Sequence, residues 1–184
     1  MTDTCPTQGS RAIVALDAGE YVAAIPELAA LLVDAVEGGA AVNFLAGVTE
    51  DEAAAWWTSR IPKVADGTIT AFVARLNGSI VGSTLLIRSR NQNSPHRAEI
   101  AKVLVHRSAR RRGLGRSLMT TAEATAIAEG RWLLVLDTRT GSDADVFYRS
   151  LGWQELGTLP NHSYRTDGVL APTTFFWKDL RTAD

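Results

Sequence analysis

The chain is poor in the residues that build disulfides, metal sites and membrane spans. It has one cysteine, Cys5, among 184 residues, so an intrachain disulfide is impossible. Its histidines, His96, His106 and His162, lack metal-ligand spacing, so we expect surface or loop positions and no metal site. No apolar run approaches the roughly 20 residues of a membrane span, and the N-terminus lacks an apolar signal core. We therefore expect a cytoplasmic protein that binds no membrane.

Net charge is also nearly absent. With a charge of −1, 21% charged and 46% hydrophobic residues, the composition is that of an ordinary globular protein. A surface without an overall positive charge argues against general nucleic-acid binding. The length favours one domain over residues 1–184, with 1–9 as a flexible tail, and no repeat or linker interrupts it. The sequence leaves the oligomeric state open, and a homodimer is one of the states that it permits.

The most informative stretch covers residues 98–130. An apolar run at 100–105 indicates a strand, and from residue 114 on the apolar residues recur with helical spacing until Gly130, which follows the helix end. The turn between the strand and the helix is rich in arginine and glycine and reads Arg110, Arg111, Arg112, Gly113, Leu114, Gly115 and Arg116.

This turn predicts an anion site. Backbone N–H groups at the start of a helix have no internal partner, and the helix dipole favours negative charge there. Glycines at 113 and 115 remove the Cβ atoms that would keep a bulky anion from the backbone. The four arginines supply charge that suits a pyrophosphate. The alternative is a chance glycine pair beside arginines on a solvated surface.

Hydrophobic spacing and turn signals predict the remaining elements. We expect Pro26 to start a second helical piece or a kink, and Thr49 with Glu52 to form a capping box. Asn77-Gly78 predicts a hairpin, and a long polar loop through Tyr164 should join the last two strands. The expected strands are 12–16, 68–76, 80–87, 132–136, 153–159 and 173–177, and the expected helices are 21–36, 49–64 and 143–151. These elements predict one α+β domain with a mixed sheet.

Two motifs resemble the GCN5-related N-acetyltransferases, the GNAT superfamily. The order Val103-Leu104-Val105, Arg110-x-x-Gly113-x-Gly115 and then a helix resembles its acetyl-CoA signature, and segment 145–153 resembles its second motif. The fold that this implies is a single, mostly antiparallel sheet flanked by helices, in which the parallel fourth and fifth strands splay apart to admit the cofactor. The chain most closely resembles the tabtoxin resistance acetyltransferases of this superfamily, through segments 39–44, 97–102, 136–138, 141–142, 147–148, 166–168 and 172–173.

Transfer of acetyl from a thioester to an amine requires a base, an acid and donors for the developing oxyanion. An amine with a pKa of about 10.4 must lose a proton, which costs about 4–5 kcal/mol at pH 7. Glu99 and Asp137 are the candidate bases if their strands are parallel neighbours, and burial of Asp137 after five apolar residues would raise its pKa. The structural alternatives are an ion pair of Glu99 with Arg97 or Lys102, and a turn cap by Asp137.

The resemblance implies further roles. It supports both carboxylates as the base and implies that Tyr148 is the acid beside the CoA sulfur, although a buried tyrosine is often only a core residue. It implies that residues 103–105 run beside the pantetheine arm, where a bulge frees an N–H for the thioester oxygen, and that residues 110–116 hold the phosphates. Two departures are Arg107, where many members have proline, and Gly141, where many have asparagine.

The acceptor is much less well defined. By position, the loop around Asn43 and Phe44 and the loop around Tyr164 should wall its site, although Phe44 fits the core equally well. We expect direct transfer from acetyl-CoA to a small-molecule amine in a ternary complex, with toxin or antibiotic detoxification as one role. Cys5 is a poor nucleophile, so we expect no acetyl-enzyme. Two alternatives stay open: a protein or peptide acceptor, and a non-catalytic acyl-CoA sensor.

Overall fold

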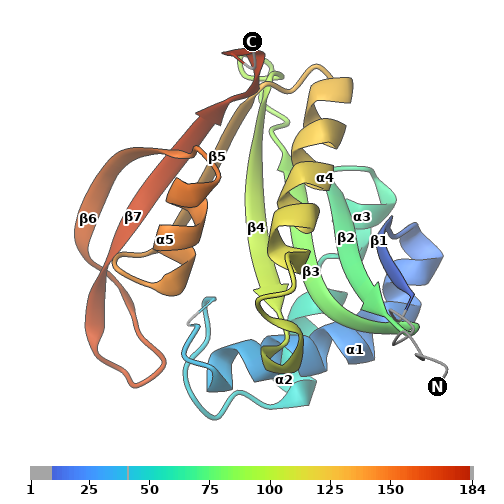
Figure 1. The fold of residues 1–184 in the computed structure, drawn as a ribbon. Helices are drawn as coiled ribbons and strands as arrows, with labels where there is room; N and C mark the ends of the chain where they lie inside the picture. The colour runs from blue at the N-terminus through green and yellow to red at the C-terminus, as the bar shows by residue number, and fades with distance from the viewer. Residues whose placement is uncertain (1–9, 41, 183–184) are drawn as a thin grey trace, which may run out of the picture.

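Seven strands form one mixed sheet in the order β1-β2-β3-β4-β5-β7-β6 (Figure 1). The computed structural model describes residues 10–40 and 42–182, so the tail expected at 1–9, with Cys5, lies outside the described residues. The strands are β1 (Arg11–Ala15), β2 (Ile69–Leu76), β3 (Ser79–Arg88), β4 (Arg97–Val105), β5 (Leu133–Arg139), β6 (Gln154–Tyr164) and β7 (Leu170–Asp179). This α+β fold and its mixed sheet confirm the expected fold class.

Helices cover both faces of the sheet. In the described residues the helices are α1 (Ala18–Glu37), α2 (Glu50–Thr58), α3 (Ile61–Ala65), α4 (Leu114–Ala128) and α5 (Asp143–Ser150). Buried residues of α1 and α2 pack against one face, which we call the α1 face. Buried residues of α4 and Tyr148 of α5 pack against the opposite face, which we call the α4 face (Figure 1). No helix among the described residues is long and apolar enough to cross a membrane.

The sheet opens between β4 and β5. These strands are parallel neighbours, but they pair over only three positions, which end at Glu99 opposite Val135. Beyond that point β4 stays with β3 and β5 stays with β7, so the two strands diverge (Figure 1). The predicted splay of the fourth and fifth strands is therefore present, and it begins beside Glu99.

Prolines bear on two predictions about the helices, of which the single helix over 49–64 was wrong. Pro62 lacks an N–H group and its ring clashes with the preceding turn. The single helix expected over 49–64 is therefore two helices, with Pro62 in the first turn of α3. Conversely, α1 continues through Pro26 as one helix. Pro26 lies on the exposed side of α1, where water can bind the carbonyl that loses its partner, while the buried side holds the helix against the sheet.

The C-terminal strands are longer than expected. The hairpin of β6 and β7 closes over residues 165–169, so Tyr164 ends a strand and is not in the long loop that the polar sequence predicted. The hairpin at Asn77-Gly78 is confirmed, with positive φ at both residues. The capping box of Thr49 and Glu52 is also present.

Candidate active site

The two predicted carboxylates lie on one face of the opening between β4 and β5. Ala98 and Ile100, the neighbours of Glu99, pack against α4 and α5, so Glu99 points to the α1 face. Asp137 lies two residues beyond Val135, the partner of Glu99, and therefore shares that face. The splayed strands thus place both carboxylates at one edge of the same gap.

The surroundings of Glu99 favour a base. Desolvation raises its pKa, and the negative charge of Asp137 raises it further, while Lys102 and Arg97 lower it. The side chain is still exposed on its solvent side, which leaves the carboxylate accessible. Neither carboxylate makes a hydrogen bond or ion pair with the described residues, so the structural alternatives expected for them, an ion pair of Glu99 and a turn cap by Asp137, are not seen.

Asp137 differs from what the sequence predicted. It is exposed, so the burial expected from the five apolar residues before it is not present. The reason is the end of strand pairing: Asp137 stands past the point where β4 leaves β5, and no neighbouring strand covers it on that side. Its charge still acts on Glu99 and on Tyr148.

Lys102 is a member of the site that the sequence did not reveal. It is 9% exposed, and its ammonium lies 4.5 Å from the ring centre of Trp56. Desolvation and the nearby guanidinium of Arg60 lower its pKa to about 8, against the opposing charges of Asp137 and Glu99. Lys102 therefore lies within the field of both carboxylates and draws down the pKa of Glu99. A lysine within the apolar run at 100–105 was the available signal.

Trp56 forms the aromatic wall behind Lys102. Arg60 stacks on the same ring at 4.4 Å, and Phe44 meets it edge to face with ring centres 6.4 Å apart. The adjacent Trp57 fixes this wall, because its indole N–H donates to the Leu28 carbonyl of α1 at 3.0 Å. Phe44 thus contacts Trp56 and also packs against the core, and its role in the acceptor site stays a prediction.

A bulge interrupts β4 beside the gap. Ser83 pairs with Leu104 and Leu85 pairs with Ala101, so Thr84 faces two residues of β4. Lys102 adopts a φ of 52°, and its carbonyl accepts a hydrogen bond from the Ser83 hydroxyl at 3.0 Å. A bulge leaves backbone groups outside the ladder. An unpaired N–H at this place suits the thioester oxygen that the sequence resemblance implied.

Tyr148 approaches the gap from the opposite side. It is 6% exposed and packs on the α4 face with Trp153 and Phe176. Desolvation raises its pKa, and so does the charge of Asp137, which shows that the two groups interact across the opening. Its hydroxyl makes no hydrogen bond within the described part of the chain. It therefore remains protonated at neutral pH and can donate.

The turn before α4 has the geometry of an anion site. Gly113 caps the helix with a φ of 75° and no side-chain cap, so the first amides of α4 lack a side-chain partner. A Cβ at Gly113 would meet only the Arg11 guanidinium, at 3.9 Å. Around it, the exposed Arg111, Arg112 and Arg116 have no hydrogen bond or ion pair from their side chains to described residues.

Other residues of the turn have structural roles. The Arg110 Nε donates to the Val105 carbonyl at 3.1 Å, which ties the turn to the end of β4. Leu114 is buried in the core, so only its backbone can face a ligand. A Cβ at Gly115 would lie 3.2 Å from the Phe147 ring, so this glycine allows α5 to approach α4. The lack of a side chain at Gly115 therefore serves the packing of α5 on α4 as well as access to the backbone.

The predicted acceptor walls meet only in part. The Ala46 amide donates to the Thr166 carbonyl at 2.9 Å, which joins the loop that follows α1 to the β6–β7 hairpin. Asn43 is exposed on that loop at a φ of 73°. Tyr164 is 55% exposed and pairs with Leu170, and no contact brings it to the carboxylates.

Comparison with known proteins agrees with this geometry. Residues 67–155 match the family model of the acetyltransferase (GNAT) domain. Residues 67–155 thus resemble a GNAT acetyltransferase domain. The matched stretch includes the β4 bulge, both carboxylates, Tyr148 and the turn before α4, so the recognised domain and the site built above are the same part of the molecule.

Solved structures resemble nearly the whole chain. The ribosomal-protein-alanine N-acetyltransferase of Brucella melitensis is 26% identical with a TM-score of 0.74, covering 92% of this chain and 99% of that one. A Salmonella typhimurium protein solved with acetyl-CoA is 21% identical, with a TM-score of 0.73 and coverage of 93% and 94%. A phosphinothricin acetyltransferase of Sinorhizobium meliloti, also with acetyl-CoA, is 18% identical, with a TM-score of 0.73 and coverage of 92% and 88%.

A buried aspartate anchors the turn before α4. Asp34 of α1 accepts the Arg107 backbone N–H at 3.0 Å and its Nε at 2.7 Å, and the His106 Nε2 lies 3.3 Å away. Burial acts to raise the pKa of Asp34, but the bonds and charges of Arg107 and His106 outweigh it and lower the pKa. Arg107, which replaces the proline of many members, thus fixes the turn through a side chain.

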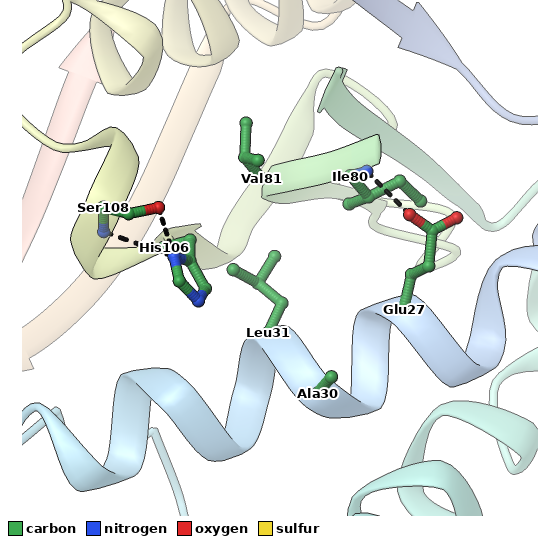
Figure 2. A pocket seen from close by; sticks show the side chains of 7 residues that line it. All are labelled: Glu27, Ala30, Leu31, Ile80, Val81, His106 and Ser108. Atoms are coloured by element: carbon green, nitrogen blue, oxygen red, sulfur yellow. Dashed lines mark hydrogen bonds between the residues drawn. The ribbon is translucent and has the colours of Figure 1, made fainter. Parts of the chain in front are cut away.

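A cavity of about 270 Å³ lies next to this anchor, between α1 and β3 (Figure 2). His106 bonds Ser108 on one side of it, and Glu27 accepts the Ile80 amide at 2.7 Å on the other (Figure 2). It holds none of the predicted site residues. Glu99, Asp137 and Tyr148 lie instead at the gap between β4 and β5.

Proposed function

We propose that this protein transfers the acetyl group of acetyl-CoA to the amine of a small molecule by direct attack in a ternary complex. The enzyme class and the donor expected from the sequence are confirmed, because residues 67–155 match the GNAT acetyltransferase domain and two similar structures contain acetyl-CoA. The observation that carries the mechanism is the arrangement of Glu99 and Asp137 on one face of the gap and Tyr148 on the other.

The donor side holds the thioester. The open amides of α4 and the unpaired arginines 111, 112 and 116 bind the phosphates of CoA. The pantetheine arm runs along residues 103–105, and a backbone N–H at the bulge binds the thioester oxygen as negative charge develops there. When the phosphates and the pantetheine arm bind in these places, the sulfur lies near Tyr148, which packs on the same face of the sheet as α4.

The acceptor side activates the amine. Glu99, with its raised pKa, takes the proton directly or together with Asp137. The neutral amine attacks the acetyl carbonyl, the carbon–sulfur bond breaks, and Tyr148 donates a proton to the leaving thiolate. Because donor and acceptor approach from opposite faces, the reaction needs no enzyme nucleophile and no acetyl-enzyme.

The acceptor loops favour a small molecule over a peptide. The hydrogen bond between Ala46 and Thr166 joins the loops on either side of the acceptor, whereas a peptide needs an open groove. The similarity to the Brucella enzyme keeps a protein amine as the second candidate. Detoxification like that of the tabtoxin resistance acetyltransferases remains a proposal, supported by the phosphinothricin acetyltransferases among the similar structures.

The proposal is tested by measuring thiol release from acetyl-CoA with a panel of small amines and of peptides. We expect turnover with a subset of the small amines and little with peptides. Turnover with peptides alone would establish the second candidate. Tight binding of acetyl-CoA without turnover on any acceptor would instead support an acyl-CoA sensor and contradict the assignment of Glu99 as the base.

A further inference from the structure

A second cavity, of about 360 Å³, lies at the end of β5, beyond the point where β4 and β5 cease to pair. Arg139, the last residue of β5, lines it together with the loop that follows, and Arg165 lines it from the β6–β7 hairpin. Both charged residues in the lining are arginines. The cavity is therefore electropositive, although the chain as a whole has a net charge of −1.

The two arginines differ in what they contact. Arg165 forms an ion pair with Asp167 on its own hairpin. The half-buried side chain of Arg139 makes no hydrogen bond or ion pair with any residue in the described ranges. A guanidinium that faces a cavity without a counterion has five donors ready for an anion, and its planar fork matches a carboxylate.

The position of Arg139 relative to Asp137 is fixed by the strand β5. It follows Asp137 by two residues on β5, so both side chains share the α1 face, about 6.6 Å apart along the strand. Their partners on β7, Thr173 and Phe175, confirm a regular ladder at this place. One small molecule can therefore place an amine at Asp137 and a carboxylate at Arg139.

Two cations near the base are already engaged. Lys102 stacks on Trp56 and interacts with the charges of both carboxylates. Arg60 stacks on the same ring and donates to the Ser59 hydroxyl at 3.2 Å. Arg97 also acts on Glu99, but it is exposed at the start of β4, where β4 and β5 still pair, and it lines neither of the two cavities. Arg139 lines a cavity beside the base and makes no ion pair with the described residues, so it is the cation best placed to hold the acceptor.

We propose that the acceptor is an amino-acid-like molecule, whose carboxylate binds Arg139 while its amine lies at Glu99 and Asp137. The inference rests on the proposed acetyltransferase function and narrows its substrate class. Arg139 then determines specificity, because it holds the acceptor without taking part in proton transfer. The engaged Arg165 contributes only to the general potential of the cavity.

The test compares matched acceptors. Thiol release is measured with the common amino acids and 4-aminobutyrate, with the amides of the same acids, and with the corresponding decarboxylated amines. We expect at least one acid to be preferred about 10- to 100-fold in kcat/KM over its amide and its amine, the range of a hydrogen-bonded charged group. Arg139→Gln should remove this preference through the KM of the acid, and Arg139→Lys should be intermediate.

Controls separate this inference from the function on which it rests. Arg165→Gln should retain most of the preference, and both Gln variants should bind acetyl-CoA as the wild type does in calorimetry. Equal use of acid, amide and amine by the wild type would overturn the inference alone, as would a preference that survives Arg139→Gln. Weaker acetyl-CoA binding by Arg139→Gln would place the cavity on the donor side and overturn it too. No thiol release with any amine or peptide would overturn the proposed function, and this inference with it.

Discussion

The two sides of the gap between β4 and β5 are built in different ways. The donor side consists mainly of backbone: the bulge of β4, the left-handed Gly113 and the first amides of α4, all within one continuous stretch. The acceptor side consists of side chains from distant segments, with Trp56 from α2, Lys102 from β4 and Arg139 from β5. One side is therefore local in sequence, and the other is assembled by the fold.

This difference determines how each side responds to a change of side chain. A backbone site tolerates changes of side chain provided that glycine and the cap geometry remain, so it suits a constant ligand such as the phosphates of CoA. A side-chain site changes its ligand when one residue changes. We therefore expect mutations on the donor side to affect all acceptors equally, and mutations on the acceptor side to discriminate among them.

The largest effect should come from removing the base. Glu99→Gln combined with Asp137→Asn should lower turnover by about 1,000-fold, within the range of general-base catalysis. Acetyl-CoA affinity, measured by calorimetry, should not change, because neither carboxylate lies on the donor side. Normal turnover of the double variant with the acceptor panel would contradict the assignment.

The next largest effect should come from closing the anion site. Gly113→Val should weaken acetyl-CoA binding by about 100-fold, because it forces a β-branched residue to a positive φ and fills the place of the phosphates. Gly78→Val is the matched control, since Gly78 has a φ of +89° and open space around it in a remote hairpin. Equal acetyl-CoA affinity of the two variants would overturn the phosphate assignment.

Tyr148→Phe should act on the chemical step alone. We expect kcat to fall about 10- to 100-fold as the proton donor for the thiolate is lost, with KM for both substrates unchanged. The melting temperature should stay close to that of the wild type, because the hydroxyl has no hydrogen-bond partner within the described residues. A large loss of stability with full activity would show that Tyr148 is only a core residue.

The pH dependence should report the charges around Glu99. Because the raised pKa of Glu99 belongs to a base that must be deprotonated, kcat/KM should rise with pH through a limb above the usual range of glutamate. Asp137→Asn removes a charge that raises this pKa, so the limb should move to lower pH. Lys102→Met removes a charge that lowers it, so the limb should move to higher pH. Shifts in the opposite directions would exclude Glu99 as the titrating group.

The smallest effect should come from the contact between α4 and α5. Gly115→Ala puts a Cβ at 3.2 Å from the Phe147 ring and should lower the free energy of unfolding by about 1 kcal/mol. Phe147→Leu in the same chain should restore part of it. Denaturant unfolding measures the stability of both variants. If Gly115→Ala lost more binding free energy for acetyl-CoA, measured by calorimetry, than free energy of unfolding, Gly115 would be shown to serve the anion directly.

Local signals predicted most of the fold. The hairpin at Asn77-Gly78 and the capping box at Thr49 rest on residues within a few positions of each other, and both are present. The single helix expected over 49–64 was wrong because Pro62 lies in the first turn of a separate helix, whereas α1 continues through Pro26. Both prolines are exposed, and periodicity alone did not reveal which of them would begin a new helix.

The sequence by itself determined the strand–turn–helix unit and the open amides at the start of its helix, because a left-handed glycine before a helix and its unpaired N–H groups are properties of neighbouring residues. It also named Glu99 and Asp137 as candidates through their strand positions, with support from the resemblance, and Tyr148 through the resemblance. Only the tertiary structure decided that desolvation falls on Glu99, that Lys102 stacks on Trp56, and that Arg139 faces a cavity without a partner. Burial and charge at these positions depend on where β4 leaves β5 and on which distant segments fill the space beside them.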